Sequence, residues 1–151
     1  MALTYQKEDW IVFMEDCGEL IVAHWQDVAL DQATVELDPD WDTYNCIDAQ
    51  GGLEVVTARD EGTLVGYSIH IISTHIHYKN LKIAEGDVFW LDSAYRRGMA
   101  GIKLLKAAEK HLVAIGVDKV INKVKLHKDV VRIFERLGYT AIERVYAKGL
   151  A

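Results

Sequence analysis

The chain has 151 residues, of which 50% are hydrophobic and 26% are charged. This length and composition predict one globular domain and exclude a disordered chain. The 17 Lys and Arg against 23 Asp and Glu give a formal net charge of -6, which argues against nucleic-acid binding and suits a cationic partner. No stretch reaches ~18 apolar residues and the N-terminus lacks the pattern of a signal peptide. We therefore expect a cytoplasmic protein without a membrane partner.

The N-terminal part, residues 1–52, is predicted to be helical and then irregular. Apolar residues recur every three or four positions from Glu8 to Leu30, which is the spacing of a helix face. Gly18 interrupts this stripe, so one helix and two helices that meet near Gly18 are both compatible with it. The acidic stretch from Asp31 to Gly52 is broken by Pro39 and predicts a loop with a short helical turn, in a position suited to lining a substrate pocket.

Residues 53–91 predict three strands. Leu53 to Arg59 alternates as a strand does, Thr63 to Tyr78 is rich in Ile, Val and Tyr, and the turn Asp60 to Gly62 joins them into a hairpin. A second turn at Lys79 to Lys82 leads into a central strand from Ile83 to Leu91. We expect this strand to lie in the middle of the sheet.

Strand alternation places His75 and His77 on one face. Two imidazoles two residues apart on a strand can share a metal ion, but no third ligand follows at a telling spacing, so we predict no metal site. Two interpretations of His75 and His77 remain: the pair is solvated, or it lines a polar groove. In the second case His75, His77 and Tyr78 bind substrate.

The second half predicts a helix, a strand, a short helix and a last strand. Their ranges are Met99 to Ile115, Val117 to Leu126, Asp129 to Leu137 and Tyr139 to Lys148, with Asp129 at the start of the short helix. Strands followed by helix, strand, helix and strand are typical of an α+β or mixed α/β fold in one domain, with a sheet core over residues 53–151.

A glycine-containing turn separates the central strand from the long helix. Gly98 and Gly101 allow backbone amides to approach a bulky group closely as the helix begins. Free N–H groups and the positive end of the helix dipole favour an anion there. Arg96 and Arg97 add positive charge, so the turn predicts a pyrophosphate site.

Over about Leu53 to Leu150 the chain resembles the GNAT N-acetyltransferase superfamily. In that family the loop after the fourth strand reads Arg or Gln, two free positions, Gly, one free position, then Gly or Ala, and it wraps the pyrophosphate of acetyl-coenzyme A. Arg96 takes the first position, Met99 stands at the first glycine and Gly101 at the last. The resemblance implies a mixed, mostly antiparallel central sheet flanked by helices, with acetyl-coenzyme A as cosubstrate and an amine as acceptor.

The resemblance also implies which residues bind the cosubstrate. They are Leu91, Asp92, Arg96, Arg97, Gly98, Met99, Ala100, Gly101 and Ile102. A strand amide near Leu91 would polarise the thioester carbonyl. Met99 departs from the family glycine, and Gly98 supplies flexibility one residue earlier.

The segment from Leu126 to Tyr139 resembles a second family signature, an Asn-led helix that ends in Tyr-x-x-Leu-Gly-Phe. His127 stands for the Asn and Phe134 for the Tyr. In many members that Tyr protonates the departing thiolate, which phenylalanine cannot do. The candidate replacements are His127, Tyr95 and water.

A general base is also required, because an amine must be neutral to attack a thioester. Strand alternation predicts that Glu85, Asp87, Phe89 and Leu91 share one face of the central strand. Glu85 lies eleven residues before Arg96, which is similar to the position of a catalytic glutamate in some family members, and Asp87 could share its role. Exposed acids without a function are the alternative.

Two functions remain open at this stage. The first is acetyl transfer from acetyl-coenzyme A to a primary amine of a small molecule, a peptide or a protein. The second is a binding or structural module that kept the fold and lost catalysis, which Met99 and Phe134 motivate. The sequence leaves the acceptor and the oligomeric state, including a homodimer, undetermined.

Overall fold

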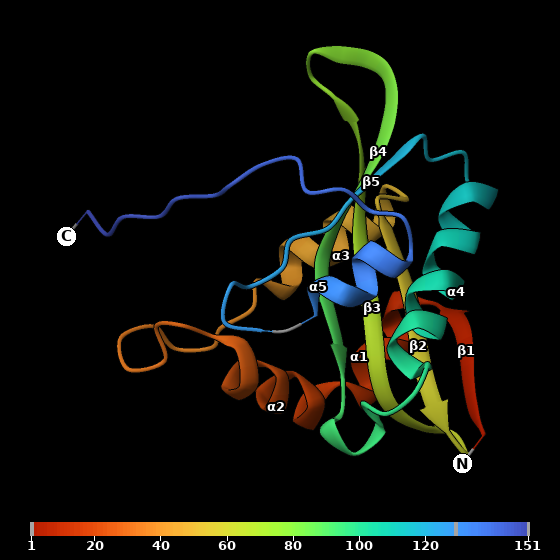
Figure 1. The fold of residues 1–151 in the computed structure, drawn as a ribbon, viewed down its shortest axis with the longest axis vertical. Helices are drawn as coiled ribbons and strands as arrows, with labels where there is room; N and C mark the ends of the chain where they lie inside the picture. Colours follow the sequence, from red (N-terminus) through yellow and green to blue (C-terminus); the bar gives the residue numbers. More distant parts are fainter. Residues whose placement is uncertain (1, 129, 151) are drawn as a thin grey trace.

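The computed structural model describes residues 2–128 and 130–150. Its core is one five-stranded sheet whose spatial order follows the chain (Figure 1). The strands are β1 (Leu3–Glu8), β2 (Leu53–Asp60), β3 (Thr63–His75), β4 (Tyr78–Leu91) and β5 (Lys119–Ile121). The first four pair antiparallel, and β5 runs parallel to β4. The predicted mixed, mostly antiparallel sheet is confirmed.

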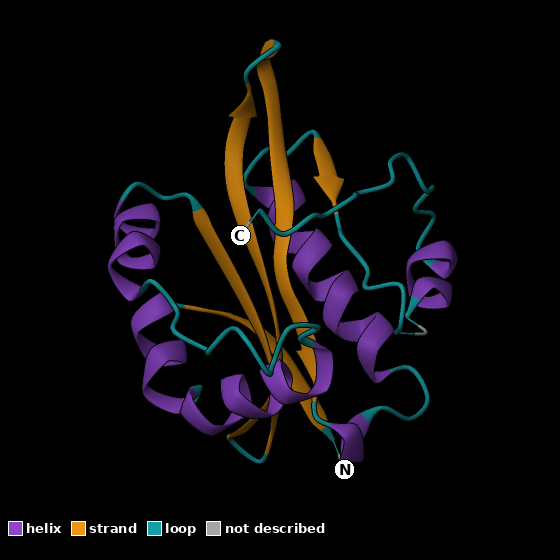
Figure 2. Ribbon diagram, turned by 90° about the vertical axis from the view of Figure 1, so that its left-hand side faces the viewer, coloured by secondary structure: helices purple, strands orange, loops and turns teal. Residues whose placement is uncertain are grey.

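Helices cover both faces of this sheet, as Figure 2 shows. One face carries α1 (Trp10–Asp16), α2 (Gly18–Val28) and α3 (Trp41–Ala49), and the other carries α4 (Ala100–Ala114) with α5 (Val131–Arg136) nearby. A single 3-10 turn, η1 (Ser93–Tyr95), connects β4 to α4. Among the described helices, none has both the length and the apolar character needed to cross a membrane.

Two apolar clusters hold the layers together. Val55, Tyr67 and Trp90 pack under α1 and α2, whereas Val56 and Leu91 pack with the apolar side of α4. Each fully buried side chain of this size contributes about 1.5–3 kcal/mol. The middle strands are therefore covered on both faces, and β2 is buried from Leu53 to Arg59 although Glu54, Thr57 and Arg59 are polar.

The sequence predicts that the N-terminal part is helical and then irregular. The structure corrects this prediction, because the part begins with a strand. β1 precedes the helices and pairs with β2, with Leu3 opposite Asp60. The short strand was missed because its residues alternate weakly and are mostly polar. The two-helix alternative is correct, since α1 ends before Cys17 and α2 begins at Gly18.

Two predicted loops are also corrected. The stretch Asp31 to Gly52 contains the nine-residue helix α3, whose start is capped by Asp40 through a 2.9 Å bond from the backbone N–H of Thr43. The turn expected at Lys79 to Lys82 lies instead at residues 76–77, so β4 is longer than predicted.

The C-terminal region departs furthest from the prediction. β5 has only three residues, and the strand predicted from Tyr139 to Lys148 is wrong, because this segment runs as exposed chain away from the sheet (Figure 1). A strand needs a partner for its backbone groups, and local composition does not supply one. The predicted helix start at Asp129 lies outside the described residues. The helix itself is present as α5.

Candidate active site

The strand β4 has an open edge. Its pairing with β5 ends at Glu85 opposite Ile121, and β4 continues to Leu91 without a described strand on that side. The N–H of Asp92 donates to the carbonyl of Val65 on β3 at 2.8 Å. Backbone groups of successive strand residues point to opposite sides, so the amides of Leu91 and Phe89 face the open edge.

A β-bulge lies where this edge begins. Gly86 pairs with His70 and Val88 pairs with Ile69, which leaves Asp87 as the extra residue of β4. Bulges bend a strand and re-aim its side chains, and they are frequent next to active sites. The alternation of side chains along β4 does not predict this irregularity.

The bulge corrects the prediction that four β4 side chains share a face. Glu85 lies opposite Ile71, which packs with the cluster under α1 and α2, whereas Phe89 and Leu91 pack with the α4 cluster. Strict alternation fails because the extra residue shifts the phase of the strand.

Both candidate bases nevertheless reach the same side of the sheet. The hydroxyl of Tyr44 on α3 donates to Oδ2 of Asp87 at 2.5 Å, and the Tyr44 ring stacks on Trp10 at 5.1 Å. Burial, followed by the Asp87 bond, raises the pKa of Tyr44, which keeps its hydroxyl a donor. Glu85 lies 3.3 Å from the ammonium of Lys123 and its side chain is 45% exposed.

The glycine turn presents free amides at the start of α4. Gly98 has φ of +64°, in the left-handed region that glycine tolerates. Met99 occupies the N-cap position without a side-chain hydrogen bond, and the first helical bond runs from the Lys103 N–H to the Met99 carbonyl at 2.8 Å. The amides of Ala100, Gly101 and Ile102 therefore have no acceptor within the helix and suit an anion.

Gly101 also serves the packing of α5. A Cβ on this residue would lie 3.2 Å from Cδ1 of Ile133 and 3.8 Å from the Phe89 ring. The side chains of Leu91 and Ile102 are buried. Only the backbones of these two predicted cosubstrate residues are available to a ligand.

The guanidinium of Arg96 makes its hydrogen bonds within the protein. Its Nε donates to the Leu91 carbonyl at 2.6 Å, and its Nη2 donates to Oδ2 of Asp27 on α2 at 2.6 Å. The guanidinium lies over the Trp90 ring at 5.4 Å. Asp27 also accepts from Trp90 Nε1 at 3.0 Å and from Lys128 Nζ at 2.7 Å. Arg96 thus braces the glycine turn against α2.

A comparison with models of protein families gives a result that is consistent with this fold and with the glycine turn. The model of the acetyltransferase (GNAT) family matches residues 14–139. The chain belongs to the GNAT family. No curated protein matches it closely enough to count as a relative.

Solved structures of similar fold support the same architecture. A transcriptional regulator from Bacillus halodurans C-125 is 17% identical with a TM-score of 0.76, covering 99% of this chain and 100% of its own. A ribosomal-protein-alanine N-acetyltransferase from Brucella melitensis biovar Abortus 2308 is 16% identical with a TM-score of 0.73 and the same coverage. Glucosamine-6-phosphate N-acetyltransferase from Arabidopsis thaliana is 16% identical with a TM-score of 0.72, and each chain is covered completely.

This GNAT chain offers no side-chain acid at the position of the family tyrosine. Phe134 is buried between the rings of Phe89 and Tyr139, at 6.1 and 5.3 Å. The hydroxyl of Tyr95 donates to Asp60 at 2.9 Å and points toward the β2–β3 turn. Tyr95 is therefore engaged away from the open edge.

The remaining predicted cosubstrate and acid residues differ in their availability. Arg97, Met99 and His127 are exposed, with His127 on the loop after β5. The Asp92 side chain accepts from the Ala94 N–H at 2.8 Å and so caps η1. Its role is structural in this arrangement.

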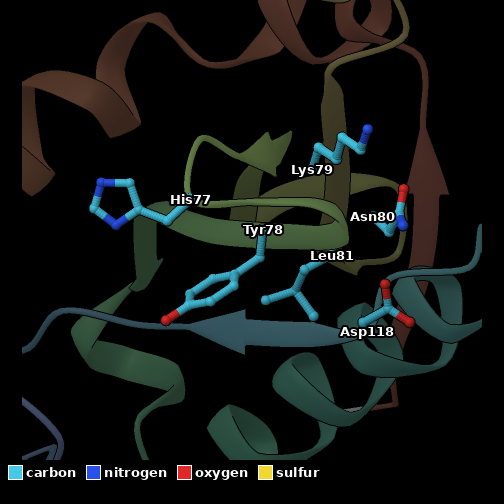
Figure 3. A pocket seen from close by; sticks show the side chains of 6 residues that line it. All are labelled: His77, Tyr78, Lys79, Asn80, Leu81 and Asp118. Carbon is cyan, nitrogen blue, oxygen red and sulfur yellow. The ribbon is translucent and has the colours of Figure 1, made fainter.

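The predicted substrate residues lie at the far end of β4 from the glycine turn. The rings of His75 and His77 are 5.3 Å apart at the tip of the β3–β4 hairpin, and Tyr78 begins β4, thirteen residues before Leu91 and roughly 40 Å away along the strand. An open hollow at this tip is lined by His77, Tyr78, Lys79, Asn80, Leu81 and Asp118 (Figure 3). Within residues 2–128 and 130–150, no group of three His, Cys, Asp or Glu is placed to hold a metal ion.

Three residues near the candidate site were not predicted from the sequence as site residues, namely Tyr44, Asp27 and His24. Nδ1 of His24 lies 2.8 Å from the Tyr67 hydroxyl, and its ring stacks on Trp90 at 5.8 Å. Burial lowers the pKa of His24 to about 4, so this ring is neutral at pH 7. The side chains that contact these three residues come from other strands and helices, so their neighbours in the sequence do not predict the contacts. Only the cap of α3, from Asp40 to Thr43, has a local sequence signal.

Proposed function

We propose that this GNAT protein transfers an acetyl group from acetyl-coenzyme A to a primary amine. The observation that carries the proposal is the open edge of β4, which runs from the bulge at Asp87 to the free amides at the start of α4. One end of this edge offers carboxylates and the other offers anion-binding amides. An extended ligand with a phosphorylated end and a reactive end fits that order.

Acetyl-coenzyme A has this shape, and it supplies the activated acetyl group. The N–H of Leu91, on the open edge of β4, can donate to an amide of its pantetheine arm, as in an added strand. The amides of Ala100, Gly101 and Ile102 suit its pyrophosphate.

The spacing along β4 favours Phe89 over Leu91 as the donor to the thioester oxygen. Leu91 lies four residues from Asp87 and six from Glu85, about 13 and 20 Å along a strand, whereas Phe89 lies two and four residues from them, about 7 and 13 Å. A base and the carbonyl that its amine attacks must be close together. The Phe89 amide is therefore placed to stabilise negative charge on the oxygen.

Asp87 and Glu85 supply the basic groups. Either carboxylate can accept a proton from the incoming ammonium, directly or through water. The Tyr44 hydroxyl fixes the Asp87 carboxylate at the bulge. Since Phe134 has no proton to give, water protonates the departing thiolate, whose ordinary pKa of about 8.5 makes it a ready leaving group.

The second candidate is a module that binds without catalysis. Phe134 in place of a tyrosine and Met99 in place of a glycine favour it, and one structure of the same fold is described as a transcriptional regulator. Cosubstrate binding without amine-dependent thiol release would support this candidate.

Thermal unfolding with acetyl-coenzyme A tests the first step. At a ligand concentration of about 100 times the dissociation constant, binding should add roughly 2.7 kcal/mol to the free energy of unfolding. Coenzyme A should give a similar rise in melting temperature, and pantetheine, which lacks the pyrophosphate, a smaller one. An unchanged melting temperature at millimolar acetyl-coenzyme A would remove the proposal.

A further inference from the structure

The carboxylate of Asp27 holds an alkylammonium group within the protein. Its Oδ1 accepts only from Nζ of Lys128 in the described residues, at 2.7 Å, while its Oδ2 accepts from Trp90 Nε1 and from Arg96 Nη2. The two donors on Oδ2 come from β4 and from the braced turn. Oδ1 is thus a fixed acceptor whose present partner comes from a loop.

This acceptor lies beside the proposed reaction site. Arg96 connects the Asp27 carboxylate to the Leu91 carbonyl on the open edge of β4 through a single guanidinium. Phe89, the proposed donor to the thioester oxygen, is two residues away, or about 7 Å along the strand. A group bound at Asp27 would lie on the order of 10 Å from a reacting amine.

The Lys128–Asp27 ion pair is partly open to water, although Lys128 is the contact that does most to hold the pKa of Asp27 well below its usual range. The side chains of Asp27 and Lys128 are 26% and 30% exposed, and partly exposed ion pairs of this kind are weak. Another primary ammonium in the same place would restore the same charge balance. The neighbouring His24 ring is neutral at pH 7 and does not repel it.

We propose that Oδ1 of Asp27 binds a second, non-reacting ammonium of the acceptor, and that Lys128 occupies this position in the free protein. The acceptor class is then a diamine or polyamine, or another molecule with two separated amino groups. The net charge of -6 favours the approach of such cations. This inference rests on the proposed acetyl transfer only in assuming that the other amino group of the acceptor is acetylated.

The Trp90 indole provides a test that requires no catalysis. Its N–H donates to Asp27, so its nitrogen-proton NMR signal reports the state of that carboxylate. The chain has four tryptophans, and the Trp90→Phe variant assigns the signal. In Lys128→Met the signal should shift, and n-pentylammonium should return it toward its wild-type position in a saturable manner, whereas n-pentanol should not.

The wild-type protein is the matched comparison for that titration. Because Lys128 competes for Oδ1, its removal should tighten n-pentylammonium binding by about threefold to fivefold. No saturable response in folded Lys128→Met, or the same response after Asp27→Asn is added, would overturn the inference. Neither result would bear on the proposed function, which is tested separately through acetyl-coenzyme A binding.

A kinetic comparison then tests the acceptor class. The ratio of kcat/KM for 1,7-diaminoheptane, which is long enough to span the two positions, to that for n-heptylamine should fall by about fivefold in Asp27→Asn. Because both amines are measured with the same variant, the ratio removes any effect of the substitution on the Arg96 contact or on cosubstrate binding. An unchanged ratio in an active variant would show that Asp27 only supports the turn.

Discussion

His70 should make the fold sensitive to mild acid. This residue is 2% exposed on β3, opposite Glu54 and Gly86, and neither ring nitrogen makes a hydrogen bond of good geometry within the described residues, although the Asn122 side chain acts on the ring and partly opposes the lowering of its pKa. Burial lowers its pKa to about 4, against 6.5 for an ordinary histidine. Between these values the unfolded chain takes up a proton that the folded chain does not. The free energy of unfolding therefore falls as the pH drops from 6.5 toward 4.

The size of this effect follows from the shift. A difference of about 2.5 pH units corresponds to about 3 kcal/mol in the free energy of unfolding. His24 has a similarly lowered pKa and should lose stability in the same window, although it is more exposed. The measurement is urea unfolding at several pH values between about 7 and 4 for the wild type and His70→Gln.

The variant should lose about 3 kcal/mol less than the wild type over that range, whatever its stability at pH 7. His77→Gln, at the exposed hairpin tip, is the matched control and should retain the wild-type loss. Parallel pH curves for His70→Gln and the wild type would refute the reasoning, since His70 would then titrate alike in both states.

Three further predictions concern the site. At least one of Glu85→Gln and Asp87→Asn should lower turnover by about 10²-fold, less at high pH where the amine is already neutral, with coenzyme A affinity nearly unchanged; wild-type turnover in both variants would exclude these acids. Tyr44→Phe should lower turnover in steady-state assays through Asp87 alone, so it should have no added effect once Asp87→Asn is present, and additive losses would contradict this. Gly86→Ala should lower the urea-measured stability by about 1–3 kcal/mol because a Cβ would collide with the Asn122 side chain, and Asn122→Ala should relieve that loss.

The parts of the fold with a strong local period were predictable. The β2–β3 hairpin follows from two β-rich runs around Asp60 to Gly62, and α4 follows from its apolar stripe and its stop at Gly116. The glycine turn was predictable for the same reason, since a strand, glycines and a helix follow one another in the chain. These features need only neighbouring residues to form.

The features that long-range pairing creates were not predictable. β1 and the false strand from Tyr139 to Lys148 show this from both sides, because the first is polar and paired while the second is β-rich and unpaired in the described structure. The bulge at Asp87 depends on the register between β3 and β4, which alternation cannot reveal. Asp27 and Lys128 are 101 residues apart in the chain, so no local pattern connects them.

The central claim is amine-dependent acetyl transfer, and the release of free coenzyme A measures it most directly. Purified protein with acetyl-coenzyme A should release thiol slowly alone and faster when primary amines are added, with one acetyl group appearing on the amine for each thiol. The dependence should weaken in the Asp87→Asn or Glu85→Gln variant that loses turnover. If acetyl-coenzyme A binds and thiol release remains unchanged across a panel of mono-, di- and polyamines, the claim is contradicted and the protein is a GNAT-fold binding module.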